Sequence, residues 1–153
     1  MTANVYYFLS PFQIANADAF QQLKTDWGKD DYYNFDDLNR VEYFTKKVKD
    51  KILFFYGISG VLDENIFVGR DIKTIEYSDS LNRLESNIKQ LGTELKTPTG
   101  FIAPKVNWRR NDSFSFIDAN RLELNLKILL DYIDGQINAL QYCGQITCGE
   151  GVI

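Results

Sequence analysis

The chain has 153 residues, with 17 basic and 21 acidic side chains, a net charge of -4 and no histidine. The absence of histidine removes the commonest general base and the commonest metal ligand, and with them every catalytic triad of the serine-protease type. An acidic chain without a basic face is also a poor nucleic-acid binder. The length favours one domain covering 1–153, and an aromatic content of 14% supplies large side chains for a core and for interfaces.

The start of the chain lacks a basic segment followed by a long apolar run, which argues against a secretion signal. The apolar run 52–58 is far too short to span a bilayer. We therefore expect a protein that is made in a cytoplasm and has no membrane partner.

In chain order, the first expected element is a helix within 11–24, where apolar residues recur at helical spacing. The segment 53–68 contains apolar runs broken by glycine and acidic residues, so it is either a β-hairpin or a buried loop. Residues 97–104 include two prolines and are expected to form an extended linker. The glycine-rich tail 143–153 is expected to be irregular.

Two segments of the chain, 24–42 and 105–123, align without a gap. Eight of their 19 positions are identical, and both tryptophans of the chain, Trp27 and Trp108, share one of these positions. A shorter third copy, 80–85, lacks the tryptophan and the aromatic lead-in. The shared pattern is Asp or Ser, apolar, Asn, Arg, apolar, Glu, which indicates one structural unit used several times. The repeat units are predicted at about 24–52, 70–92 and 105–135.

The repeated positions define the candidate site residues, which we interpret as a structural motif. They are Trp27, Asp37, Asn39, Arg40 and Glu42; Asn82, Arg83 and Glu85; and Trp108, Asp118, Asn120, Arg121 and Glu123. Part of the pattern follows from how helices begin. Asn34 and Ser115 are placed to be N-caps that accept from free backbone amides, each with an aspartate three residues later as in a capping box. In the middle copy, Ser78 or Ser80 is the expected cap.

Beyond the expected caps, apolar residues recur every three or four positions, which is typical of helices that pack along one face. The stripes are Leu38, Val41, Thr45, Val48 and Ile52; Leu81, Leu84, Ile88 and Leu91; and Ala119, Leu122, Leu126, Leu129 and Ile133. Gly92 and Gly135 are expected to end the second and third helices. The predicted fold class is mainly α, with three or four short helices opened by a repeated N-terminal capping motif, extended linkers and at most one small β-hairpin.

The three recurring glutamates allow two interpretations. Two of them could act as acid and base, as in glycosidases, or each could bind an Asn, Arg or Lys near its own helix start. Repetition favours the structural interpretation, because an acid–base pair needs two unlike environments. For Asn39, Asn82 and Asn120 we expect each amide to bind a backbone group of the aromatic lead-in or of an adjacent copy, with the neighbouring arginines bridging to carboxylates. Simple solvent exposure is the alternative.

Other residues that could carry chemistry are less informative. The run Lys46–Lys51 is either the solvated end of a helix or a phosphate-binding patch. Cys143 and Cys148 are free thiols, a small-loop disulfide or half of a metal site that no other Cys or His can complete. Patterns for a phosphate loop, a calcium loop and a nucleophile elbow are not recognisable. We therefore expect no enzyme activity, no cofactor and no bound metal.

The motif of a Trp, a turn, an aromatic residue and Asp-x-Asn-Arg-apolar-Glu-x-Asn resembles segments of minor structural, baseplate and fibre proteins of tailed bacteriophages that infect Gram-positive bacteria. The matching stretches are 108–125, 27–42 and 81–88, about a third of the chain. The first copy departs from the motif at Phe44, where the other two copies have asparagine. The resemblance implies a particle-associated role and carries over no catalytic or ligand residue.

Together, the residues and the resemblance predict a structural subunit of a bacteriophage virion, in the tail, neck or baseplate, made in the host cytoplasm. It would act by protein–protein assembly with other virion proteins and with further copies in a homo-oligomer. Nucleic acid and membrane are not expected partners. The alternative is a head fibre or host-receptor-binding attachment protein, whose exposed aromatic side chains would bind host surface glycans. An enzyme and an unrelated interaction module are the remaining classes.

Overall fold

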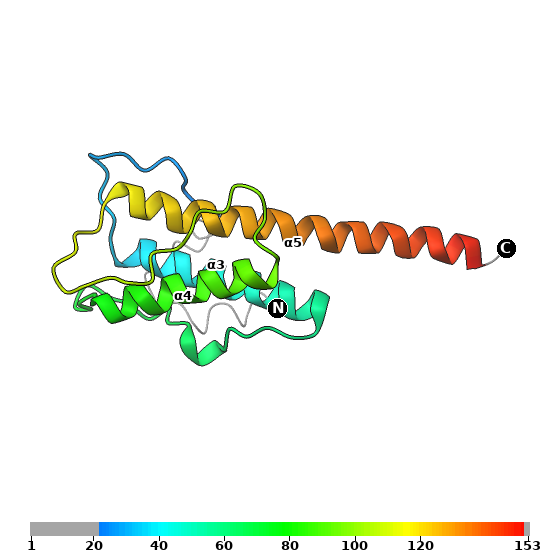
Figure 1. Cartoon of the computed structure of the whole chain (residues 1–153), viewed down its shortest axis with the longest axis horizontal. Coiled ribbons are helices and arrows are strands. Elements are labelled where there is room, and N and C mark those ends of the chain that lie inside the picture. Colours follow the sequence, from blue (N-terminus) through cyan, green and yellow to red (C-terminus); the bar gives the residue numbers. More distant parts are fainter. Residues whose placement is uncertain (1–21, 152–153) are drawn as a thin grey trace.

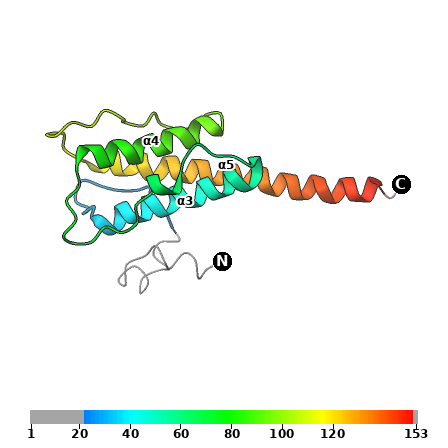
Figure 2. The ribbon, with the colours of Figure 1, turned by 90° about the horizontal axis from the view of Figure 1, so that it is seen from below.

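A computed structural model describes the backbone of residues 22–151 and the side chains of residues 22–140. The helices of this part are α3 (Phe35–Tyr56), α4 (Ser78–Glu94) and α5 (Phe116–Gly151), with a short 3-10 turn, η2 (Asp63–Asn65), between α3 and α4. The described residues contain no strand, so this part of the chain is mainly α, as predicted. The helices lie side by side in a bundle, and α5 continues well beyond the other two (Figures 1 and 2).

Each helix buries one apolar stripe, and the three stripes have the same spacing. The buried side chains are Val41, Thr45, Val48 and Ile52 of α3; Leu84, Ile88, Leu91 and the adjoining Leu95; and Ala119, Leu122, Leu126, Leu129 and Ile133 of α5. The predicted core is therefore confirmed, although Leu81 is only partly buried at its edge. Full burial of one such aliphatic side chain contributes about 1.5–3 kcal/mol. The hydroxyl of Thr45 donates to the carbonyl oxygen of Val41 at 2.8 Å, which satisfies the polar atom inside the core.

The three helices do not begin in the same way. At α3, the side chain of Asn34 accepts from the backbone N–H of Asp36, and the carboxylate of Asp37 accepts from the backbone N–H of Asn34, as in a capping box. At α5, the backbone N–H of Ser115 donates to the carboxylate of Asp118 at 2.9 Å, but the Ser115 hydroxyl donates to that carboxylate as well and does not accept from a backbone amide as expected. The N-cap of α4 is Tyr77, whose side chain makes no capping bond.

The expected caps of the middle helix are therefore wrong. Both Ser78 and Ser80 lie inside the first turn of α4, after the N-cap. The hydroxyl of Ser80 donates to Glu76 and accepts from Arg70, so it is engaged in an ion-pair network in place of the helix terminus.

The helices also end elsewhere than predicted. Gly57 ends α3 with φ of 79°, and its N–H donates to the carbonyl oxygen of Leu53 at 2.8 Å. Gly92 lies inside α4, where its missing side chain makes room for the ring of Phe101. Gly135 lies inside α5, which is 36 residues long, so this helix is not short.

Two further expectations about irregular segments are corrected. No β-hairpin forms in 53–68. Residues 53–56 belong to α3, and the following 3-10 turn is bound to α3 through the contact between Asp63 and Lys49. The tail expected to be irregular from 143 continues α5 through Gly151. Most of the helix expected within 11–24 lies outside the described residues, and 22–24 are not helical.

Candidate functional site

An extended segment precedes each helix, and we call it the lead-in of that helix. The lead-ins are 22–31 for α3, 65–74 for α4 and 102–112 for α5. Each lead-in packs against a helix of another repeat unit as well as against the helix that follows it. The repeated motif residues therefore meet at three contact regions. We call these regions joints. The first joins α3 to the lead-in of α4, the second α4 to the lead-in of α5, and the third α5 to the lead-in of α3.

In each joint, an asparagine amide binds both backbone groups of one lead-in residue. In the first joint, the side-chain oxygen of Asn39 accepts from the N–H of Arg70 at 3.1 Å, and its Nδ2 donates to the carbonyl oxygen of Arg70 at 2.9 Å. The equivalent pairs are Asn82 with Trp108 (2.7 and 3.1 Å) and Asn120 with Trp27 (2.8 and 2.9 Å). The predicted bonds to lead-in backbone are confirmed, and solvent exposure of Asn39 is excluded because its side chain is fully buried.

A glutamate completes each joint by accepting from the same lead-in and from an arginine. In the third joint, Glu123 accepts from the N–H of Lys24 at 2.7 Å, from Nε1 of Trp27 at 3.1 Å and from Nε of Arg40 at 2.8 Å. The equivalent sets are Glu42 with the N–H of Phe67 and Arg83, and Glu85 with the N–H of Lys105 and Arg121. All three glutamates are at most 1% exposed.

The arginines connect the joints into a closed ring. The lead-in of each helix docks on a neighbouring helix. The arginine of the first helix then pairs with the glutamate of that neighbour. The ion pairs are Arg40 of α3 with Glu123 of α5, Arg83 of α4 with Glu42 of α3, and Arg121 of α5 with Glu85 of α4. The expectation that each glutamate binds partners near its own helix start is therefore wrong, because its arginine comes from another repeat unit.

The two motif aspartates support this ring from the helix starts. Asp37 pairs with Arg40 at 3.0 Å, and Asp118 pairs with Arg121 at 2.9 Å, each one helical turn away. The same carboxylates accept from the N-cap backbone, so each aspartate fixes both the start of its helix and the arginine of the joint.

The middle unit replaces an aromatic pair by an ion pair. Trp27 contacts Tyr33 edge to face, with ring centroids 4.8 Å apart, and Trp108 and Phe114 stack at 5.8 Å. The equivalent residues of the middle unit are Arg70 and Glu76, whose Nε and Oε2 atoms are 2.9 Å apart. This replacement was missed in the sequence, although Arg70 precedes Asn82 by the same 12 positions that separate each tryptophan from its asparagine.

The middle unit also differs at the position of the lead-in lysine, where it has Phe67. Lys24 lies over the ring of Trp27 at 4.9 Å, and Lys105 lies over that of Trp108 at 3.8 Å. In the middle unit the order is reversed, since the guanidinium of Arg70 lies 5.5 Å from the ring of Phe67. A cation–π contact is thus present in all three units, with cation and ring exchanged in one of them.

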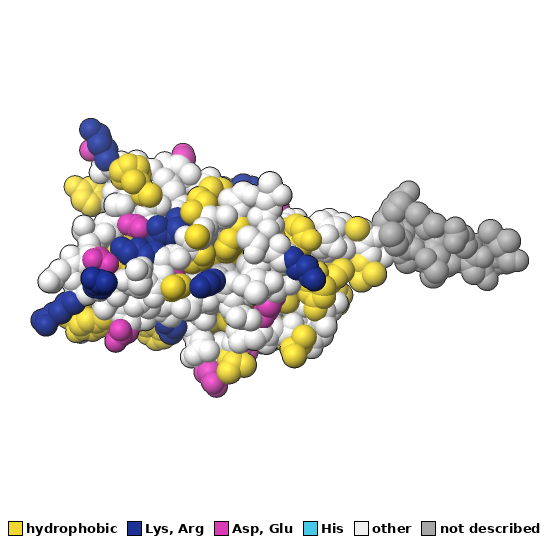
Figure 3. Space-filling view, in the orientation of Figure 1, with side chains coloured by type: hydrophobic (Ala, Val, Ile, Leu, Met, Phe, Trp, Pro, Cys, Tyr) yellow, Lys and Arg dark blue, Asp and Glu magenta, His cyan; other side chains and the backbone are white. Residues whose placement is uncertain are grey.

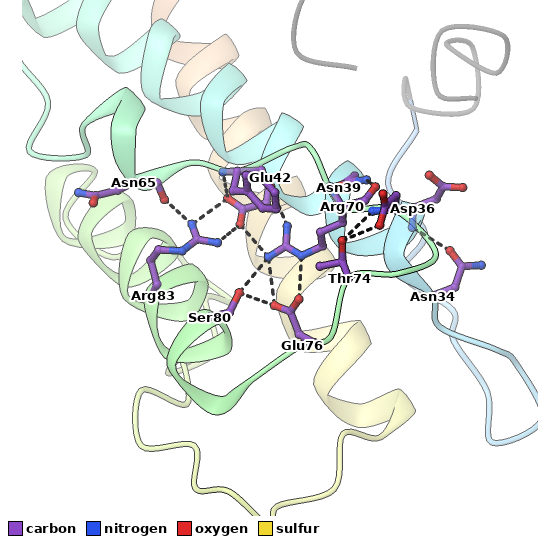
Figure 4. A network of polar contacts seen from close by, with 12 residues as sticks. Asn34, Asp36, Asn39, Glu42, Asn65, Arg70, Thr74, Glu76, Ser80 and Arg83 are labelled. Carbon is purple, nitrogen blue, oxygen red and sulfur yellow. Dashed lines mark hydrogen bonds and ion pairs between the residues drawn. The ribbon is translucent and has the colours of Figure 1, made fainter. Parts of the chain in front are cut away.

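Arg70 is the most connected side chain of the ring, and it is 1% exposed. Its guanidinium donates to both Glu42 and Glu76, to the hydroxyl of Ser80 and to the carbonyl oxygen of Phe67. Figure 4 shows Arg70 between the two carboxylates, with Arg83 on the other side of Glu42. Such a buried guanidinium is tolerated because charged or polar acceptors surround it.

Burial also acts on the carboxylates of the second and third joints. Burial raises the pKa of Glu85 and of Glu123 above the ordinary value of 4.5, although the ion pairs with Arg121 and Arg40 oppose this shift. Each glutamate has its own lead-in donors and an arginine from another unit, and Glu42 binds Arg70 as well, so the three lie in separate joints. The arrangement holds helices together and does not pair two carboxylates as acid and base.

The remaining candidate residues lie outside the ring. Within the run Lys46–Lys51, Lys46 and Lys49 bind Asp63, and Lys51 binds Asp134 of α5, so much of this run is paired with carboxylates of the same chain. The side chains of Cys143 and Cys148 lie outside the described residues. In the described part of the chain, no three His, Cys, Asp or Glu side chains are grouped so that they could hold a metal ion. No helix of that part combines the length and apolar character needed to cross a bilayer.

Comparisons of the chain with protein-family models, with curated proteins and with solved structures gave no match.

Proposed function

We propose that this chain is a structural subunit of a bacteriophage virion, in the tail, neck or baseplate, and that it acts by protein–protein assembly. The main support for this proposal is that the motif residues hold the helices of the chain together. The Asp, Asn, Arg and Glu residues of the phage-like motif bind other parts of the same chain, through backbone groups, ion pairs or helix starts. The motif thus ties the three helices to one another, which is a structural role.

The surface of this block also favours assembly. Large apolar side chains are strongly exposed at both ends of the bundle, among them Tyr32, Phe54, Ile58 and Ile72. Aromatic side chains are enriched at protein interfaces, and the buried centres of interfaces are more apolar than the rest of the surface. A particle subunit would cover them with neighbouring subunits.

The test is whether the chain belongs to the particle. Particles produced by the phage that encodes the chain would be purified on a density gradient and probed with an antibody against the chain, and a deletion of its gene would be examined by electron microscopy. We expect the chain in the particles, labelled at one position, and incomplete tails or baseplates in the deletion. Particles that lack the chain, together with normal particles from the deletion, would overturn the proposal.

A head fibre or host-receptor-binding attachment protein is the second candidate. It is favoured by the exposure of Tyr32 and Tyr77, at 91% and 65%, because exposed tyrosine rings can stack on sugars. Binding of the purified chain to host cell walls, lost in Tyr32→Ala or Tyr77→Ala, would support this candidate. Normal adsorption of deletion particles to the host would exclude it.

A further inference from the structure

The apolar stripe of α5 extends beyond the ends of α3 and α4, which cover its first part. Ile133 is fully buried in the bundle, and Ile137 still packs against the core. Leu140, the next apolar position along this side of the helix, is 54% exposed. From 138 to Gly151 the helix continues for about 21 Å at 1.5 Å per residue, and we call this part the stalk. Figures 1 and 2 both show it projecting from the body with no other helix beside it.

A second exposed apolar group lies where the stalk leaves the body. It is formed by the end of α3 and the following turn, and we call it the shoulder. Its members and their exposed fractions are Leu53 (44%), Phe54 (73%), Tyr56 (48%) and Ile58 (75%). The ion pair between Lys51 and Asp134 fixes the end of α3 beside α5 at this point. Figure 3 shows hydrophobic side chains gathered at the base of the stalk.

The charge pattern restricts what can cover this surface. The sequence has no charged residue from 135 to 149. A nucleic acid or an anionic lipid surface would be bound through Lys and Arg, which this segment lacks. A strongly charged protein partner would likewise find no opposite charge. A second copy of this chain brings the same uncharged stretch, 135–149, which can approach without charge repulsion.

The helical form of the stalk is a further reason to expect that another chain packs against it. Gly144 and Gly149 within the stalk each lower helix stability by about 1 kcal/mol relative to alanine. A solvated helix of this length is marginal in water even with better residues, so most of its stability must come from packing. Within the described chain, no helix lies alongside the stalk.

We propose that a second copy of this chain covers the stalk and the shoulder, so that the same surface of both copies forms one self-complementary interface. The inference rests on the proposed function, assembly by protein–protein contact, and names the partner and the surface. Contact along the stalk buries Leu140, and contact at the shoulder buries Phe54 and Ile58. An interface that matches its own copy closes as a symmetric pair.

The test is the mass of the purified full-length chain in solution, measured by sedimentation velocity and light scattering over about a hundredfold range of concentration. Leu140→Asp and Phe54→Asp place a carboxylate in the stalk and in the shoulder. Tyr32→Asp is the matched control, because Tyr32 is 91% exposed and lies just after the lead-in of α3, at the opposite end of the bundle. Circular dichroism shows whether each variant retains its helices.

We expect the unmodified chain and Tyr32→Asp to have twice the monomer mass. Leu140→Asp and Phe54→Asp should weaken association roughly tenfold or more while the helix bundle stays folded. A closed ring of more than two copies built on this surface would overturn the self-complementary pair, even if the same two variants dissociate it. A strict monomer, or an oligomer unaffected by both variants, would overturn the inference. The virion test is independent, since a dimer absent from particles refutes only the proposed function, and a monomer present in particles refutes only this inference.

Discussion

Replacement of Asn39 by leucine tests the ring of joints most directly. The side chains are similar in size, and Asn39 is fully buried, so the change removes the amide with little change in packing. The backbone N–H and carbonyl of Arg70 then lose their partners in a buried place. An unsatisfied buried polar group costs about 1–3 kcal/mol, and the added apolar side chain offsets part of the loss, so we expect a net destabilisation of about 3 kcal/mol.

The assay is equilibrium unfolding in urea followed by circular dichroism, with thermal melts at the same protein concentration because association raises apparent stability. A loss of about 3 kcal/mol corresponds to a fall in Tm of about 6–12 °C for a domain near this size. Asn107→Leu is the control, since Asn107 is exposed, and it should change stability by less than about 0.5 kcal/mol. If Asn39→Leu behaves like this control, the joints do not stabilise the bundle and the reasoning is refuted.

Three further substitutions test separate features by urea unfolding. Arg40→Met leaves Glu123 buried without its guanidinium and should cost about 3–5 kcal/mol at pH 7. Burial raises the pKa of Glu123 in the folded state, so protonation of this carboxyl favours folding fully below its pKa in the unfolded chain, and this contribution is lost as the pH rises through the folded pKa. The loss of stability in Arg40→Met should therefore shrink on acidification, because a protonated Glu123 no longer needs the guanidinium. A loss of stability that grows on acidification would contradict this. Gly92→Ala should destabilise by about 1–3 kcal/mol, because its Cβ would lie 2.6 Å from the ring of Phe101, and a gain in stability would show that the ring yields. Thr45→Val should stabilise by about 1 kcal/mol by removing a buried hydroxyl, and a loss would show that its bond to the helix backbone matters more.

The sequence was sufficient to predict the core and one side of each joint. Apolar spacing identified the buried stripes, because only a helical repeat places residues such as Leu122, Leu126 and Leu129 on one face. The recurrence of an otherwise unfavourable helical asparagine indicated a fixed partner for its amide, and the lead-in backbone is that partner.

The missed features depend on residues that are distant in the chain. Gly92 looked like a helix end, but its role is set by Phe101, which packs against it from the following linker. The glutamates were assigned to local partners, whereas Arg121 and Glu85 belong to different units. Arg70 escaped notice because it replaces a tryptophan with a residue of different chemistry, and its equivalence follows from position alone.

The ring described above has a consequence for the order of events during synthesis. Asn39 and Arg70 are 31 residues apart, and Asn82 and Trp108 are 26 apart, whereas Lys24 and Glu123 are separated by 99 residues. Closing the longest of these loops costs only about 1 kcal/mol more entropy than closing the loop between Asn39 and Arg70. The delay is therefore set by translation: the first two contacts can form on the ribosome, while the backbone of Trp27 cannot bind Asn120 until α5 has left the exit tunnel.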